Sequence, residues 1–312
     1  MNSDMKKLTP LSLLLIIGLG CIASDWEDVS SDYESELNVF AFISLDETIP
    51  TFVQVRQTLG LEGSVYEFIG YDTLYNEDSS DYYIYEVTES RYAVEDADVT
   101  ISDGVTEYEL TLFDEDSLYE IEDWWRFINI FWSGGVYIDS FGLFVPEPNK
   151  DYFLTVTASD GRELTGEVTT PPIPEIKLES VPDSIDANTS YTIEFKPMPD
   201  HYGKIITSSG YWICGAEQSG FIEKGDSTWT SSVEDCGGET WGWDQPDTLT
   251  IELYFMDNNY YEYFIKHGFD DEFVNFFMGA GGSGPAFGVE GGFGTFCAVA
   301  MDRVETIIVP RE

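Results

Sequence analysis

The sequence predicts a mainly β protein with two β-sandwich domains, the first immunoglobulin- or fibronectin-like, and a short helix in the second. Apolar and polar residues alternate over many short stretches, as they do in strands with one buried face. Turn-forming pairs such as Asp-Gly separate these stretches at short intervals, which is typical of β-sandwiches. With 43% apolar and 15% aromatic residues, the composition is that of a chain with a folded core.

The first 20 residues predict a signal peptide (1–20). Lys6 and Lys7 precede the uncharged apolar run 8–20, which is too short to cross a membrane as a helix. A small residue precedes Cys21, as in a bacterial lipobox, where the cysteine thiol is lipidated and becomes the new N-terminus. We expect Cys21 to anchor the chain in a membrane. The alternative is ordinary cleavage that leaves this cysteine unmodified or removes it.

An acidic, polar segment (21–35) follows and predicts a flexible tether. Its residues Asp25, Glu27 and Asp28 resemble the surface-export signal of Bacteroidetes-type lipoproteins. That resemblance implies an outer-membrane lipoprotein that faces the cell exterior. The alternative is a solvated linker that carries no export signal.

The charge of the chain limits its partners. There are 59 acidic and 14 basic residues, for a formal net charge of −45. Nucleic-acid binding needs clustered Lys and Arg, so this class of partner is excluded. A bare anionic lipid surface is excluded for the same reason, which leaves the lipid on Cys21 as the expected contact with the membrane.

The first domain is predicted over 36–172. Asp103-Gly104 is expected to form the type I′ turn of a hairpin. Asp160-Gly161 is expected to form the turn of another hairpin. Strands are expected at 36–45, 51–59 and 82–87, hairpins at 96–113 and 150–171, and a loop at 71–83. The acid and aromatic residues of 82–87 alternate as in a half-buried strand. The inward face of the 96–113 hairpin is expected to hold Val99, Ile101, Val105, Tyr108, Leu110 and Leu112.

The proline-rich segment 171–176 predicts a domain boundary, since a strand interior would not hold so many prolines. The second domain is predicted over 173–312. It is expected to contain a helix that begins with Asn258 as its N-cap and ends at Gly268, followed by a Gly-rich loop. Its strands are expected at 190–200, 204–215, 247–257 and 297–309, and the loop at 279–296.

The cysteines predict an oxidising location. Cys214 and Cys236 lie 22 residues apart in one polar region, and we expect them to form a disulfide worth about 3 kcal/mol on the chain-entropy model. Cys297 has the sequence context of a buried strand residue. The cysteine spacings do not fit a zinc site, and His201 and His267 are the only histidines.

Two groups of tryptophans are the binding candidates. Exposed Trp side chains on loops stack on sugars or anchor protein partners, and the alternative is ordinary packing in the core or between domains. The candidates are Trp124, Trp125 and Trp132 in one group, with Phe131 beside them, and Trp241 and Trp243 in the other, with Trp229 nearby.

No cofactor is expected beyond a weak calcium site. Calcium prefers oxygen ligands, which Asp114 and Asp116 or Asp270 and Asp271 could supply. Neither run has the spacing of an EF-hand loop, and the alternative is a solvated acidic surface.

We do not expect an enzyme. His201 falls in a predicted turn and His267 at a predicted helix end, where structural roles are expected for both. The sequence contains no G-x-S-x-G elbow, zinc motif, phosphate loop or dinucleotide fingerprint. Carboxylates are too numerous for a catalytic pair to be chosen by eye.

Four segments, taken in order, resemble the outer-membrane lipoproteins of domain of unknown function 4249. The first is the lipoprotein start followed by ELNVFAFIS (36–44), and the second is the hairpin VEDADVTISDG (94–104). The third is KDYFLTVTASDGRELTGEVTTPPIPEI (150–176). The fourth joins MDNNYYEYF (256–264) with VEGGFGTF (289–296). Cys297 stands where the family pattern has glycine.

The resemblance implies a surface-exposed, non-catalytic lipoprotein, because the family has no established activity. Its members are thought to accompany TonB-dependent outer-membrane transporters, which implies a protein that binds a ligand or partner as an accessory to such a receptor. The alternative is a structural or adhesive acidic surface protein, stiffened by calcium. A glycan or peptide hydrolase is the least favoured hypothesis.

Overall fold

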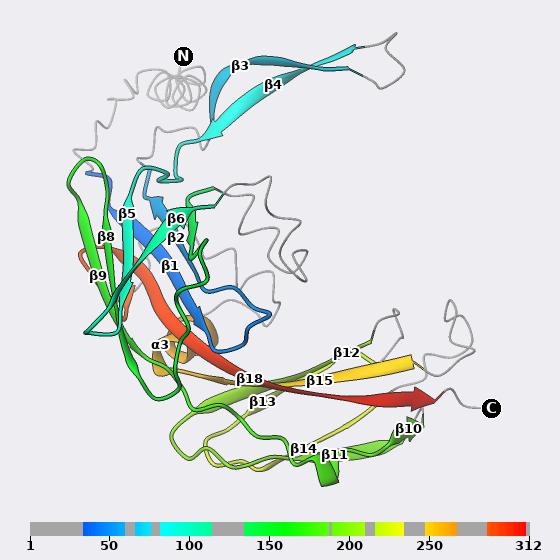
Figure 1. Cartoon of the computed structure of the whole chain (residues 1–312). Helices are drawn as coiled ribbons and strands as arrows, with labels where there is room; N and C mark the ends of the chain where they lie inside the picture. Colours follow the sequence, from blue (N-terminus) through cyan, green and yellow to red (C-terminus); the bar gives the residue numbers. More distant parts are fainter. Residues whose placement is uncertain are drawn as a thin grey trace, which may run out of the picture. The chain divides into compact units, whose positions relative to one another are not determined.

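The computed structural model confirms the predicted mainly β class (Figure 1). It describes residues 34–59, 66–75, 82–113, 134–186, 189–209, 216–233, 247–266 and 286–309. The strands of the described residues all lie in the unit Ser35–Glu312. Among the described residues, helical turns occur at η3 (Leu178–Ser180), α3 (Asn258–Tyr260) and η4 (Tyr261–Lys266). The signal peptide and almost all of the tether lie outside the described residues.

Fourteen strands form one sheet. Its hydrogen-bonded order is β13-β12-β15-β18-β1-β2-β7-β6-β5-β8-β9-β17, and β10 and β16 also pair with β18. Two separate pairs, β11–β14 and β3–β4, complete the strands. In chain order the strands are β1 (Leu37–Ser44), β2 (Phe52–Gln57), β3 (Tyr66–Tyr75), β4 (Tyr82–Ser90), β5 (Asp98–Ser102), β6 (Glu107–Leu112), β7 (Val136–Ile138), β8 (Asp151–Thr157), β9 (Glu163–Thr169), β10 (Ser184–Asp186), β11 (Ser190–Glu194), β12 (Tyr202–Ser209), β13 (Gln218–Ile222), β14 (Thr228–Ser232), β15 (Asp247–Met256), β16 (Ala286–Phe287), β17 (Val289–Glu290) and β18 (Phe293–Val309).

Strand β18 belongs to both halves of the large sheet (Figure 1). Its first part pairs in parallel with β1, from Asn38 opposite Phe293 onward. Its second part pairs antiparallel with β15. Residues 294–301 are buried at every position, because apolar clusters lie against both faces of the strand. A strand that is buried on both faces has a nearly continuous apolar sequence, as this run does.

Two main hydrophobic cores lie along this strand. The first is built from strands between β1 and β9, with side chains such as Val39, Val99 and Leu154, and it includes Phe296 of β18. In the second, Ile193 of the β11–β14 pair packs with residues of β12, β15 and β18, as in a two-layer sandwich. The predicted boundary at 172/173 falls in the segment 171–175, which lies outside every strand.

The hairpin of β5 and β6 forms as predicted, but its turn lies one residue further on. The Asp103 amide donates to the Thr106 carbonyl, so Gly104 and Val105 are the central residues. A type I′ turn needs positive φ at both central residues, and of these two only Gly104 has it. The expected type I′ turn is therefore wrong. Val105 is therefore at the tip and 93% exposed, and Leu112 at the end of β6 is 42% exposed, so neither faces the core as expected.

The second predicted hairpin, β8–β9, is confirmed with its turn at Asp160-Gly161. Gly161 donates to the Ala158 carbonyl and has φ of +89°, as in a type I turn closed by a left-handed glycine. Cys297 is buried, as predicted, and its thiol lies 3.5 Å from the Ala41 carbonyl oxygen. Burial and the nearby Asp257 raise the pKa of this thiol.

Two predicted loops are partly strand. The segment 71–83 was expected to be a loop, yet β3 runs from Tyr66 to Tyr75 and pairs with β4. The turn-forming residues behind that prediction are concentrated in 76–81, outside the described residues. Of the Gly-rich segment 279–296, the described part holds β16, β17 and the start of β18.

The helix in the second half is confirmed, but its N-cap is Asp257 rather than Asn258. The Asp257 carboxylate accepts hydrogen bonds from the amides of Asn259 and Tyr260, and also from Ala298 at 2.9 Å. The Asp257 amide donates to the Ala298 carbonyl, so one residue ties the helix to β18. Burial raises the pKa of this carboxyl to about 7, although three amides stabilise the anion.

Replacing Gly294 by alanine is expected to destabilise the fold by about 2–4 kcal/mol. Gly294 has φ of +109°, and an added Cβ would lie 1.9 Å from the Val39 carbonyl oxygen. Gly70→Ala is the control, because a Cβ there meets nothing within 4 Å; a change within about 0.5 kcal/mol is expected. Urea unfolding of the three proteins measures both effects. Equal midpoints for Gly294→Ala and the parent would contradict the close approach of β18 and β1.

The buried Asp257 carboxyl predicts a characteristic pH dependence. Its folded-state pKa of about 7 lies above the ordinary value of 3.8, so the folded protein holds the proton over a wider range. The contribution of the protonated Asp257 carboxyl to the unfolding free energy is therefore full below pH 4 and is lost as pH rises to about 7. Relative to Asp257→Asn, the parent should lose up to about 4 kcal/mol of unfolding free energy between pH 4 and 7.5. Urea titrations of both proteins at these pH values measure the unfolding free energy. If this free energy changes with pH by the same amount in both proteins, the raised pKa is contradicted.

Candidate functional site

None of the site residues predicted from sequence lies within the described residues. This applies to the lipidated cysteine, the disulfide pair, the tryptophans and the calcium candidates, so these remain predictions. They are Cys21, Cys214, Cys236, Trp124, Trp125, Trp132, Trp241, Trp243, Asp114, Asp116, Asp270 and Asp271. The nearby Trp229 is described: its ring meets Tyr191 edge-on at 6.0 Å and packs on the second core.

The described residues form neither a cluster of metal ligands nor a membrane-spanning helix. In the ranges given above, no three His, Cys, Asp or Glu side chains gather as metal ligands. Within the same ranges, no helix is long and apolar enough to cross a bilayer. His201 lies with Nδ1 3.4 Å from the Met256 carbonyl oxygen, and His267 falls outside the described residues.

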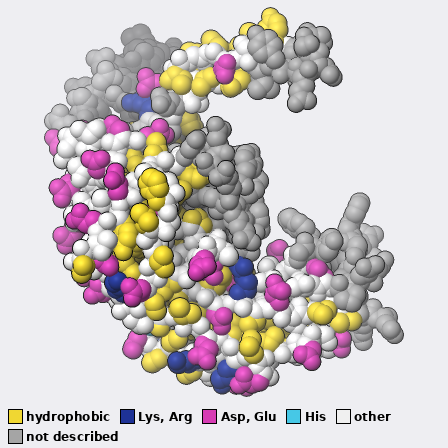
Figure 2. Space-filling view, in the orientation of Figure 1, with side chains coloured by type: hydrophobic (Ala, Val, Ile, Leu, Met, Phe, Trp, Pro, Cys, Tyr) yellow, Lys and Arg dark blue, Asp and Glu magenta, His cyan; other side chains and the backbone are white. Residues whose placement is uncertain are grey.

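The most unusual surface of the described chain is the β3–β4 hairpin. Eight of its large apolar or aromatic side chains are exposed, and the two strands pair only with each other. Figure 2 shows these side chains as yellow atoms along the arm that carries β3 and β4 in Figure 1. The eight are Tyr66, Phe68, Ile69, Tyr71, Tyr82, Tyr83, Ile84 and Tyr85. The half-buried strand expected at 82–87 is thus wrong in its burial, because no second layer of described strands covers it.

The strand register separates these side chains into two faces. A bulge at Ile69 puts Phe68 and Tyr71 on the same face although they are three residues apart, and their rings lie 5.1 Å apart. Residues opposite each other in the ladder share a face. The aromatic face, as we name it, consists of Tyr66, Phe68, Tyr71, Tyr82 and Ile84.

The opposite face of the hairpin is also open to solvent. Tyr83 is 69% exposed, and Tyr85 donates a hydrogen bond to Asp72 at 3.1 Å across the ladder. That hydrogen bond raises the pKa of the Tyr85 hydroxyl. Both faces therefore present tyrosine rings, and one tyrosine is held in place by its cross-strand neighbour.

All the charges of the two strands are negative. β3 contributes Glu67 and Asp72, and β4 contributes Glu86 and Glu89; neither strand contains Lys or Arg. The hairpin thus combines aromatic surface with carboxylates. This composition suits a partner that carries basic side chains.

A set of hydrogen bonds closes the base of the hairpin. Gln57, the last residue of β2, donates through its amide to the Tyr92 carbonyl at 2.7 Å and through Nε2 to the Arg91 carbonyl at 2.8 Å. The chain that leaves toward β3 is thereby joined to the chain that returns from β4. At the same base, the guanidinium of Arg56 lies over the Tyr92 ring at 5.0 Å.

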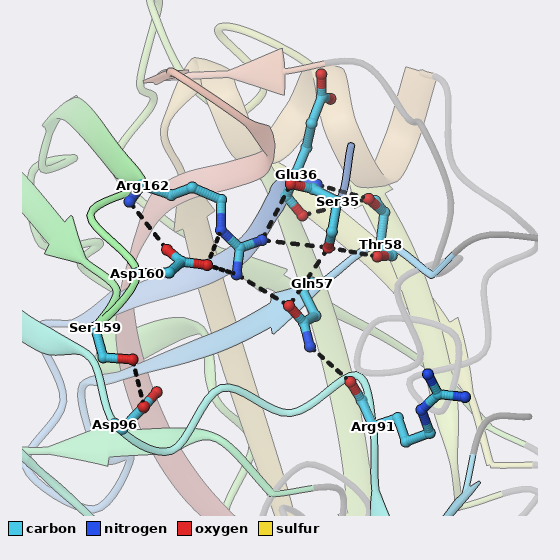
Figure 3. Close-up of polar contacts among 9 residues, drawn as sticks. All are labelled: Ser35, Glu36, Gln57, Thr58, Arg91, Asp96, Ser159, Asp160 and Arg162. Carbon is cyan, nitrogen blue, oxygen red and sulfur yellow. Dashed lines mark hydrogen bonds and ion pairs between the residues drawn. The ribbon is translucent and has the colours of Figure 1, made fainter. Parts of the chain in front are cut away.

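Arg162 extends this base to the beginning of the folded chain (Figure 3). Its Nη2 donates to Gln57 Oε1 at 3.0 Å, and its Nη1 donates to the Ser35 carbonyl at 3.1 Å. Asp160 holds the guanidinium through Nε at 2.6 Å, and this hydrogen bond lowers the pKa of Asp160. We call Ser35, Gln57, Asp160 and Arg162 the clasp.

The clasp joins two features that the sequence does not connect. Ser35 is the last residue of the predicted tether, and Gln57 begins the hairpin base. Ser35 also donates to the Thr58 carbonyl at 2.7 Å (Figure 3). The hairpin is therefore fixed close to the point where the tether enters the fold. The sequence analysis did not identify the β3–β4 hairpin as a site, although the aromatic residues are dense in 66–71 and 82–85 and could have indicated it.

A family model described as "Domain of unknown function (DUF4249)" matches residues 28–269. No curated protein matches the chain significantly. Among solved structures, the FN1-FN3 domains of chicken CNTN1 are similar at 9% identity and a TM-score of 0.29, over 70% of this chain and 60% of that one. That match spans less than two thirds of the other structure, and with so low a TM-score it adds nothing to the fold described above.

Arg162→Gln is expected to loosen the clasp without unfolding the protein. Loss of the guanidinium frees Ser35 and Gln57, so the amides of Glu36 and Gln57 should exchange with solvent about tenfold faster. Hydrogen exchange followed by mass spectrometry measures this. Lys177→Gln is the control, because Lys177 forms an exposed ion pair with Glu194 at 2.9 Å in the other half of the chain. Unchanged exchange at both amides would contradict the role of Arg162.

Proposed function

This chain belongs to the DUF4249 family, and we propose that it is a non-catalytic, lipid-anchored binding protein that docks a protein partner through the β3–β4 hairpin. The exposed aromatic face carries the proposal. Monomeric proteins rarely expose contiguous apolar patches of this kind unless a partner uses them. Tyr side chains are also among the residues that supply most of the binding energy at protein interfaces.

The stability of the hairpin supports the same function. An isolated two-stranded ribbon is marginally stable in water, because it has no second layer on which to bury a face. β3 and β4 have no such layer among the described residues, yet they form nine residue pairs that are interrupted by the bulge at Ile69. A partner that covers the aromatic face would supply the missing burial.

The partner that fits this proposal best is a TonB-dependent outer-membrane transporter. The predicted lipid on Cys21 would hold the protein at the outer membrane, facing the cell exterior. The clasp joins the last tether residue, Ser35, to the hairpin base through Arg162. The proposed partner is embedded in the same membrane as the predicted anchor. We assign no catalytic step to the protein.

The double variant Tyr71→Ser, Tyr82→Ser tests the proposal. Tagged parent protein, extracted from its native membrane in mild detergent, should retain a transporter in stoichiometric amount. Each truncated aromatic is expected to cost about 2 kcal/mol of binding, so the variant should retain at least tenfold less. Mass spectrometry of the recovered proteins is the measurement.

The matched control is Phe141→Ser, Leu143→Ser. These side chains are 75% and 69% exposed but belong to the segment between β7 and β8 and not to the hairpin strands. The control should retain the transporter. Recovery of the parent protein alone would overturn the proposal and favour a structural or adhesive role, for which a calcium-dependent rise in melting temperature is the next measurement.

A further inference from the structure

We infer that the outer edge of β4 accepts an extended, basic segment of the protein partner as an added β-strand. This rests on the proposed function in that the hairpin is taken as the docking site, and it adds the mode and the chemistry of binding. In strand addition, main-chain hydrogen bonds supply affinity and the alternating side chains supply specificity.

The first ground is the unpaired edge. Among the described strands, β4 pairs with β3 alone, so no described strand lies along the other side of residues 83–90. A free edge is a template for pairing with another chain. β4 is nine residues long and would accept an added strand of about 30 Å.

The second ground is that β4 lacks most of the features that block strand addition. Proteins protect their edges with proline, bulges, short strand length or charged side chains, lysine above all. The carboxylate of Glu86 in β4 opposes an acidic strand but not a basic one. β4 contains no Pro, Gly, Lys or Arg, and its pairing register is uninterrupted except at the bulge carried by its partner. β3 has that bulge at Ile69 and also contains Gly70. The outer edge of β4 is therefore the more receptive of the two.

Other edges in the described sheets are shorter. β17 ends the large sheet with two residues, and β13 ends it at the other side with five, including Gly220. β11 and β14 have five residues each. Only at the hairpin does the described part of the chain leave a nine-residue edge uncovered.

The third ground is charge, which also identifies the occupant. Glu86 lies within β4, Glu67 and Asp72 lie on the neighbouring strand, and neither strand has a basic residue. A second copy would place these carboxylates beside its own, on a chain of net charge −45, and like charges on adjacent strands are destabilising. A strand with Lys or Arg beside Glu86 would instead pair with it.

The side chains next to the added strand set the rest of its chemistry. Tyr82 and Ile84 lie on one face of β4, and Tyr83 and Tyr85 on the other. Cross-strand pairs of aromatic with β-branched residues are stabilising. The favoured segment therefore alternates Val or Thr with Lys or Arg and contains no proline.

A synthetic probe tests the inference on the full-length protein in detergent. The probe is a fluorescent, end-capped nine-residue peptide that alternates Val or Thr with Lys. We expect saturable binding by fluorescence anisotropy, and slower hydrogen exchange of β4 amides but not of β6 amides. A peptide with the same side chains and N-methylated alternate amides should bind at least about tenfold more weakly, because it cannot complete the main-chain ladder.

Charge reversal gives the second arm. Replacing Lys by Glu in the peptide should abolish binding to the parent, and Glu86→Lys should shift the preference to the Glu peptide. Glu109→Lys is the matched control, because Glu109 is an exposed glutamate in β6 and should leave the preference unchanged.

The outcomes separate this inference from the proposed function. Equal binding of the N-methylated peptide, or protection elsewhere than β4, overturns strand addition. No binding of the Lys peptide does the same, even if the Tyr71 and Tyr82 variant loses the transporter; docking would then use side chains alone. Binding of the peptide at β4 with no transporter recovered overturns the proposed function and leaves the receptive edge established.

Discussion

The close approach of β18 to β1 is the contact on which the rest of the fold depends. β18 is buried on both faces over 294–301 and pairs with β1 on one side and β15 on the other. The approach is possible because Gly294 has no Cβ to meet the Val39 carbonyl oxygen. Both main cores include β18 side chains, so the two halves of the chain are stabilised by one shared strand. Asp257 then ties the helical turns to the same strand through Ala298.

The β3–β4 hairpin is the opposite case, because none of its residues belongs to a hydrophobic core of the described chain. Its two strands are stabilised by each other and, at the base, by Gln57, Arg162 and the contact of Arg56 with Tyr92. The exposure of so many tyrosines therefore has no explanation within the described chain. The proposed partner surface would explain it, and the carboxylates around the rings favour a partner with basic side chains.

Local patterns predicted the elements that local chemistry decides. The alternation in β1, β2 and β15 gave strands within two residues of their observed bounds, and Asp160-Gly161 turned a hairpin as expected. Errors arose where a neighbour distant in sequence decided the outcome. Asp257 caps the helix instead of Asn258 because its carboxylate also binds the Ala298 amide. The error at Val105 is local instead: this residue is exposed because the turn centres on Gly104 and Val105 rather than one residue earlier.

The sequence alone predicts the mainly β class, the acidic charge, the membership of the family and the expected anchor at Cys21. These depend on composition, on periodicity and on short motifs, which are properties of neighbouring residues. Burial is not such a property. The segment 82–87 has the alternation of a half-buried strand, but it is an exposed surface because no second layer of described strands lies over β3 and β4. The clasp likewise joins Ser35, Gln57 and Arg162 across more than one hundred residues, and only the packing of β2 beside the β8–β9 turn could bring them together.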